Sequence, residues 1–101
     1  MAYMIQTVKL SDHPETVAIN WPSAFDASKA KIHLHRTSSH VPPTGYVSAP
    51  VQVGEGVKPQ DIVLKITRDN NEMPEDAVYL GTYSDSYMGP TFHALHVYLM
   101  P

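Results

Sequence analysis

Short segments of alternating apolar and polar residues, separated by clusters of Pro, Gly, Asn and Asp, run through the whole sequence. A period of two places successive side chains on opposite faces of a β-strand. Nine prolines support this division, because proline is largely excluded from strand interiors. The segments with this pattern are residues 2–10, 16–21, 31–37, 45–53, 61–68, 77–84 and 91–100. About seven short strands joined by turns predict an all-β chain, folded as an antiparallel β-sandwich or a jelly-roll-like barrel.

The segment DIVLKITR shows the alternation most clearly, with Ile62, Leu64 and Ile66 on one face. A strand with one such face is buried on one side. The same phase in the other segments predicts which residues form the core. We expect this core to contain Val17, Ile19, Trp21, Ile32, Leu34, Ile62, Leu64, Ile66, Val78, Leu80, Leu95, Val97 and Leu99.

One short helix is predicted over residues 24–30, within the segment SAFDASKA. Ser23 follows Pro22 in the position of an N-cap, and Asp26 takes the place that glutamate has in a capping box. About two turns are too few for a helix to be stable by itself in water. Phe25 is therefore expected to anchor the segment to the core.

The chain has 101 residues, a length typical of one domain, so residues 1–101 are expected to form a single β domain. It has no cysteine, which excludes thiolate metal sites and fits a reducing compartment. A net charge of −3 argues against a nucleic-acid partner. The sequence shows neither a signal peptide nor a transmembrane segment, so we expect no membrane partner and a location in the cytoplasm or in a virion.

The segment KIHLHR places two histidines in alternate positions. On a strand, His33 and His35 would point outward together, about 6–7 Å apart. Two imidazoles at this spacing can bind one metal ion, but a catalytic zinc site needs a third protein ligand. The pair is similar to the H-x-H strand of cupins, yet HLHRTSSH lacks the glutamate and the glycines of the cupin pattern. No metal ligand and no cofactor are therefore assigned.

The segment YSDSYMGP contains the candidates for a hydrolytic site, Ser84, Asp85 and Ser86, and two histidines, His93 and His96, follow it. Nucleophilic catalysis needs a serine on a strained or exposed turn, a base within reach and an oxyanion hole. The sequence has no G-x-S-x-G motif, and SDS before MGP is typical of a hairpin loop. No catalytic residue is assigned, and an enzyme is not expected.

Tyrosines recur on the strand faces opposite the aliphatic rows. Tyr79 and Tyr83 alternate with Val78 and Leu80, while Tyr98 shares its side of the last strand with His96. Exposed tyrosines are favoured at protein interfaces because they supply a large contact area at a low entropy cost. Cross-strand pairing, or packing beneath a neighbouring strand, is the alternative role. The predicted interface consists of Tyr79, Tyr83, Tyr98 and His96.

These patterns favour a non-enzymatic protein-binding or assembly module. The expected partner is another protein or a second copy of the chain, within an oligomer or a larger complex. A small accessory or structural subunit, for example of a viral assembly, has this combination of features. The alternative is a metal-dependent or small-ligand-binding β-barrel of the cupin type that uses His33 and His35.

Overall fold

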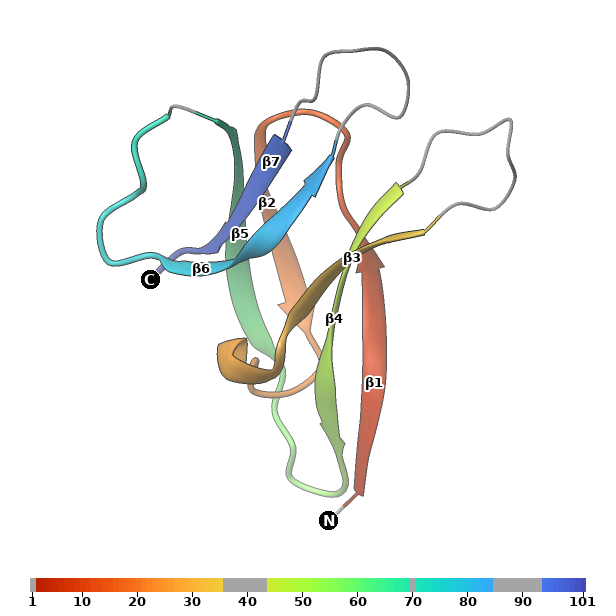
Figure 1. Cartoon of the computed structure of the whole chain (residues 1–101). Helices are drawn as coiled ribbons and strands as arrows, with labels where there is room; N and C mark the ends of the chain where they lie inside the picture. The colour runs from red at the N-terminus through yellow and green to blue at the C-terminus, as the bar shows by residue number, and fades with distance from the viewer. Residues whose placement is uncertain (1, 36–43, 70, 85–93) are drawn as a thin grey trace.

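The computed structural model of the chain describes residues 2–35, 44–69, 71–84 and 94–101 (Figure 1). This part of the chain contains seven strands and one 3-10 helix. Their bounds are β1 (Ala2–Lys9), β2 (Glu15–Trp21), η1 (Ala27–Lys29), β3 (Lys31–His35), β4 (Thr44–Val53), β5 (Gln60–Arg68), β6 (Val78–Ser84) and β7 (Ala94–Leu99). The predicted all-β class is confirmed, and each predicted strand segment contains a strand.

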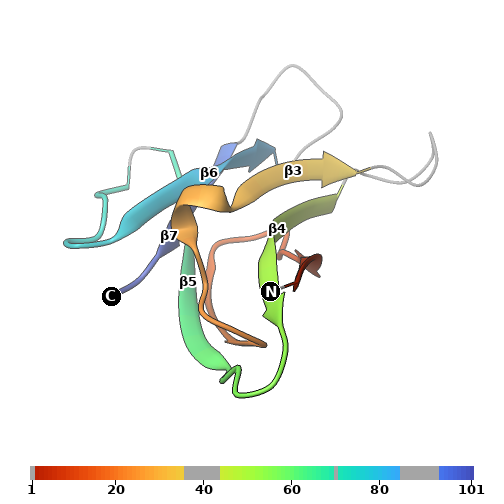
Figure 2. The same ribbon diagram turned by 90° about the horizontal axis from the view of Figure 1, so that it is seen from below.

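The strands form two antiparallel sheets that pack face to face. One sheet has the order β1-β4-β3, and the other has the order β2-β5-β7-β6. The edge strands β3 and β6 lie beside each other without pairing, so the sandwich is nearly closed along this side (Figures 1 and 2). At the opposite side, β1 has β4 as a neighbour along one edge and no strand of the described chain along the other.

Trp21, which ends β2, is fully buried and is the largest side chain of the core. Its indole Nε1 donates a hydrogen bond of 3.3 Å to the carbonyl oxygen of Pro50 in β4. The ring of Phe25 meets it edge-on, with ring centroids 5.1 Å apart. Trp21 therefore joins the two sheets by apolar packing and by a polar contact, which satisfies a donor that would otherwise be buried without a partner.

The period-two phase predicts most of the core of the larger sheet. Buried as expected are Trp21, Ile62, Leu64, Ile66, Leu95 and Val97. A second group is partly buried against them, namely Val17, Ile19, Leu80 and Leu99 of the same sheet and Ile32 of β3 in the smaller one. The three-stranded sheet contributes apolar residues that the prediction does not include, among them Val47, Ala49 and Val51 of β4.

The expected burial is wrong for two residues, since Val78 is 48% exposed and Leu34 is 43% exposed. Both belong to strands at a sheet edge. Val78 is the first residue of β6 and pairs with Leu99, while Leu34 pairs with Gly45, which has no side chain to pack beside it. Their phase along the strand agrees with the core, but the edge leaves them open to solvent.

A β-bulge in β6 changes the phase of the strand. Tyr79 pairs with Tyr98 and Gly81 pairs with Val97, so Leu80 is the extra residue. Beyond the bulge Tyr83 pairs with Leu95 on the core side, and it is only 4% exposed. The expectation that Tyr83 shares an exposed face with Tyr79 is therefore wrong, because one inserted residue moves the side chains that follow to the other face.

Tyr83 reaches across the sandwich to the smaller sheet. Its hydroxyl donates a hydrogen bond to the carbonyl oxygen of Ser11, and its ring lies against Gly45 of β4. A Cβ atom at Gly45 would lie 2.6 Å from Cε2 and 2.8 Å from Cγ of this ring. Gly45 thus makes room for the aromatic side chain that the bulge directs inward.

The expected helix over residues 24–30 is wrong in type and length, since the helical residues are the single 3-10 turn of η1. Asp26, rather than Ser23, caps this turn by accepting hydrogen bonds from the backbone N–H and the hydroxyl of Ser28. The backbone of Phe25 donates to the side chain of Gln60 instead of to a helical carbonyl. These local side-chain contacts compete with helix formation.

Replacing Gly45 with alanine is expected to lower the free energy of unfolding by about 1–3 kcal/mol, because the new methyl group overpacks the ring of Tyr83. Chemical denaturation measures the change. In the double variant with Tyr83→Ala the methyl group has room, so the combined cost should be clearly less than the sum of the two single costs. An unchanged denaturation midpoint for Gly45→Ala, or additive costs, would contradict this account.

Candidate binding surface

Three of the four predicted interface residues come together on the outer face of β6 and β7. The rings of Tyr79 and Tyr98 have centroids 5.4 Å apart, and those of Tyr79 and His96 are 5.9 Å apart. Tyr79 is 47% exposed, whereas Tyr98 lies on the same face but is only 7% exposed. Tyr79 therefore presents most of the aromatic surface here, and the expected exposure of Tyr98 is wrong. The assignment of this face to an interface stays a prediction.

His96 connects Tyr79 to a carboxylate. Its Nε2 lies within hydrogen-bond distance of Asp69 Oδ1, and its Nδ1 lies 3.1 Å from the hydroxyl of Tyr79. Since a carboxylate accepts, Nε2 carries the proton in the neutral imidazole and Nδ1 accepts from the tyrosine hydroxyl. This chain of contacts fixes the tautomer of His96 and orients the exposed ring of Tyr79.

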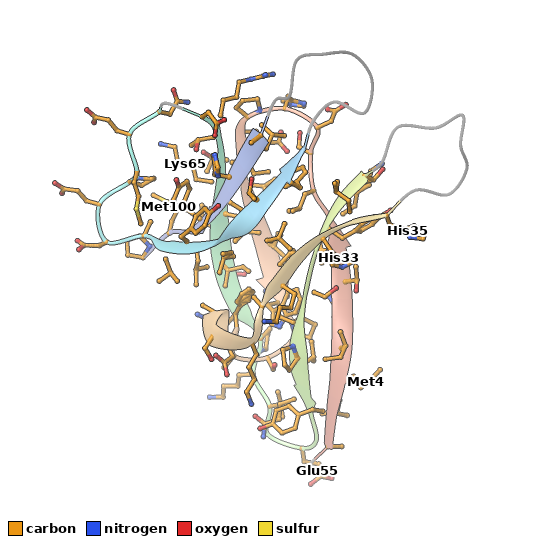
Figure 3. The ribbon with its side chains drawn as sticks, viewed as in Figure 1. Met4, His33, His35, Glu55, Lys65 and Met100 are labelled. Carbon is orange, nitrogen blue, oxygen red and sulfur yellow. The ribbon has the colours of Figure 1, made fainter. Side chains whose placement is uncertain are left out.

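His33 and His35 lie on the outer face of β3, as the alternation predicts, and both are exposed (Figure 3). Their rings flank Tyr46 of β4, with centroid distances of 5.7 Å and 6.3 Å. His33 Nε2 also lies 2.9 Å from the hydroxyl of Ser48. Across the described ranges, no three His, Asp or Glu residues are grouped so that they could hold one metal ion. In this arrangement His33 and His35 pack beside Tyr46 on the solvent-facing side of the sheet.

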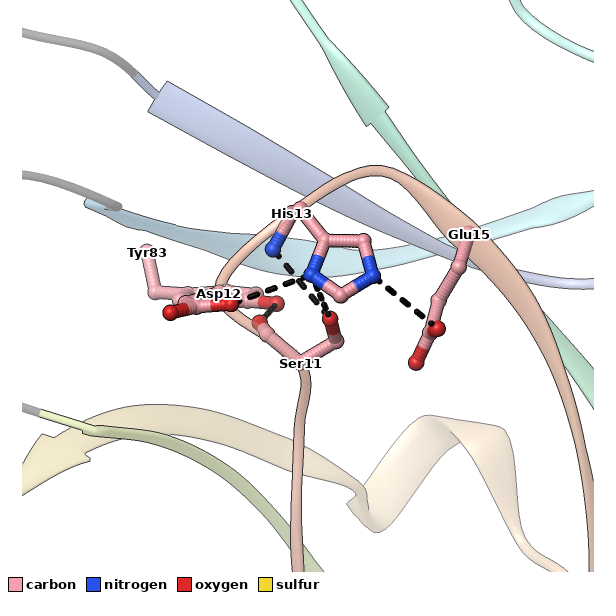
Figure 4. Close-up of polar contacts among 5 residues, drawn as sticks. All are labelled: Ser11, Asp12, His13, Glu15 and Tyr83. Carbon is pink, nitrogen blue, oxygen red and sulfur yellow. Dashed lines mark hydrogen bonds and ion pairs between the residues drawn. The ribbon is translucent and has the colours of Figure 1, made fainter.

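A cluster of polar contacts surrounds His13 in the segment between β1 and β2 (Figure 4). His13 Nδ1 lies 3.0 Å from Asp12 Oδ1, and Nε2 lies 3.4 Å from Glu15 Oε2. The hydrogen bond with Asp12, followed by the negative charge of Glu15, raises the pKa of His13. The same hydrogen bond lowers the pKa of Asp12. The cluster is exposed and local, and it lies beside the carbonyl of Ser11 that Tyr83 contacts.

The open side of β1 has the most exposed large apolar side chains of the described residues. Tyr3 is 62% exposed, Met4 63% and Ile5 67%. Tyr3 and Ile5 share the outer face of the sheet, whereas Met4, labelled in Figure 3, shares the inner face with its partner Val51 but is exposed on the open edge strand. Figure 1 shows why, since the N-terminal half of β1 and the C-terminal half of β4 project beyond the other strands. We call this unpaired strand edge, with these three side chains, the β1 edge.

The β1 edge is absent from the predicted interface. Its sequence signal is the run Tyr3, Met4 and Ile5, because consecutive apolar residues of one strand cannot all face a single core. Of the residues considered for a hydrolytic site, Asp85, Ser86 and His93 lie outside the described residues.

The fold and this surface define a two-sheet antiparallel β protein with an open apolar strand edge. Comparisons with protein-family models, curated proteins and solved structures find no match to the chain. In the part of the chain that the structure describes, no helix is long and apolar enough to cross a membrane. The function is therefore inferred from the surface itself.

Removing the carboxylate of Asp12 is expected to lower the pKa of His13 towards its ordinary value of about 6.5. Because the folded-state pKa is raised, the contribution of His13 to stability is present below the ordinary value and is lost as pH rises through the folded-state pKa. An NMR titration of the His13 ring in Asp12→Asn measures the shift. Glu55→Gln, at the far end of β4, is the control and should leave the pKa unchanged. An unchanged His13 pKa in Asp12→Asn would contradict the assigned cause.

Proposed function

We propose that this protein is a non-enzymatic protein-binding or assembly module that associates through the β1 edge. The observation that supports the proposal is the exposure of Tyr3, Met4 and Ile5, each above 60%, on a strand with one unpaired side. An unpaired edge is a template for pairing with another chain. Exposed apolar side chains beside it add the contact area that stabilises such a complex.

The features that normally protect a strand edge from association are confined to the end of β1, where Lys9 is its one charged residue. Residues 2–8 carry no charge and no proline. β1 pairs with β4 in an unbroken register from Ala2 to Lys9, so no bulge twists the edge away. Natural edge strands use charges, prolines or bulges for this purpose. Their lack over residues 2–8, on the strand with the most exposed apolar side chains, favours an edge that has a partner.

The other edge strands either expose fewer large apolar side chains than β1 or lie against a neighbouring strand. The edge strand β2 contributes none of the large exposed apolar side chains. β3 and β6 lie against each other, and β3 also carries Lys31, His33 and His35 on its outer face. These contrasts support β1 as the associating edge. A role as a small accessory subunit, in the cytoplasm or in a virion, is part of the proposal and stays a prediction.

Ile5→Lys is expected to weaken association at least about tenfold, because it places a charge in the middle of the apolar edge. Light scattering coupled to gel filtration measures the mass of the wild type and the variant over a range of concentrations, alone and with any partner recovered from the native source. Thermal unfolding should show little change, since Ile5 is 67% exposed.

Val63→Lys is the matched control, because Val63 is a strand residue that is 37% exposed on the outer face of the other sheet. This variant should associate like the wild type. Tyr79→Ser, measured in the same way, tests whether the tyrosine face contributes to association. A wild type that stays monomeric at high concentration and has no partner in its native source would contradict the proposed function.

A further inference from the structure

The directions of the backbone groups in β4 show which groups of β1 are free. The carbonyl oxygen of Pro50 accepts a hydrogen bond from Trp21, and the backbone N–H of Gln52 donates to Ser23 Oγ, so both groups are bonded outside the ladder with β1. The backbone groups of Pro50 and Gln52 therefore point away from β1. Their partners in the register are Ile5 and Tyr3. Antiparallel strands alternate between hydrogen-bonded and non-hydrogen-bonded pairs, so Ile5 and Tyr3 belong to pairs of the second kind.

The same alternation extends to Thr7, which pairs with Ser48 two residues further along. In pairs of this kind the N–H and C=O of both residues point outward from the ladder. Tyr3, Ile5 and Thr7 thus direct their backbone groups to the open side of β1. No hydrogen bond to another part of the described chain uses these groups. They form a regular row of donors and acceptors at every second residue.

We propose that the occupant of this edge is a second copy of the chain, with the two β1 strands paired antiparallel about a two-fold axis at Ile5. This inference rests on the proposed function and names its partner. In this register Ile5 lies opposite its own copy, and Tyr3 lies opposite Thr7 of the other copy. These are the residues with free backbone groups, so about six hydrogen bonds join the copies.

The side chains of β1 are complementary to themselves in this register. On the outer face Ile5 meets Ile5, and Tyr3 meets the small Thr7. On the inner face Met4 meets Gln6, and Ala2 meets Val8. Since residues 2–8 carry no charge, no like charges lie directly opposite each other across these pairs. An isologous contact of this kind closes after two copies and yields a dimer with a continuous six-stranded sheet.

Single cysteine variants test both the partner and the register, because the natural chain has no cysteine. Ile5→Cys is expected to form a disulfide-linked dimer under mild oxidation, since a hydrogen-bonded antiparallel pair has Cα atoms about 5.5 Å apart. Tyr3→Cys and Thr7→Cys should each remain unlinked when alone. When mixed, these two variants should form the disulfide-linked heterodimer.

The expected rates of linking for Ile5→Cys and for the mixed pair are at least about tenfold above that of Val63→Cys, which measures random collision. Linking of Tyr3→Cys or Thr7→Cys with itself at such a rate would overturn the proposed register. If Ile5→Lys abolishes association but no cysteine variant forms a linked dimer, the second copy is overturned as the partner. The proposed function would still stand. If no association of the chain depends on β1, both the second copy as partner and the proposed function are overturned.

Discussion

The contact between Trp21 and Pro50 determines much of what this protein presents to its surroundings. It holds the end of β2 against the C-terminal half of β4, and so joins the two sheets. Tyr83 makes the corresponding contact near the other end of β4, with Gly45 and Ser11. β1 is the edge strand of its sheet, and its residues 2–5 are exposed. The carbonyl of Pro50 that accepts the bond from Trp21 belongs to a non-hydrogen-bonded pair with Ile5, whose backbone groups therefore lie on the open edge.

The period-two pattern predicts the strands and the core of the larger sheet, because each strand buries one face and this requirement is local. It fails at β6, where Leu80 is inserted and Gly81 has a φ of +150°. A Cβ atom at Gly81 would lie 2.9 Å from Ile32 Cγ1, so the bulge depends on a contact between the sheets. A contact between sheets leaves no periodic pattern in the sequence. The inward direction of the Tyr83 side chain could therefore not be predicted from the sequence.

The candidate surface could be predicted from the sequence only in part. The outward direction of His33 and His35 follows from their alternation with Ile32, but their packing on Tyr46 requires the register between β3 and β4. The run Tyr3–Ile5 is visibly apolar, yet a strand with this composition could equally lie at the centre of a sheet. Its exposure depends on the strand order and on the distance that β1 and β4 project beyond their neighbours.

Amide hydrogen exchange along β1 tests the central claim most directly, because the claim concerns individual N–H groups. In dilute solution the amides of Tyr3, Ile5 and Thr7 should exchange quickly, while those of Met4 and Gln6, which face β4, should be protected. As the concentration rises and the edge becomes paired, the first three amides should become protected as well. Rapid exchange of Tyr3, Ile5 and Thr7 at every concentration, with and without a recovered partner, would contradict the account.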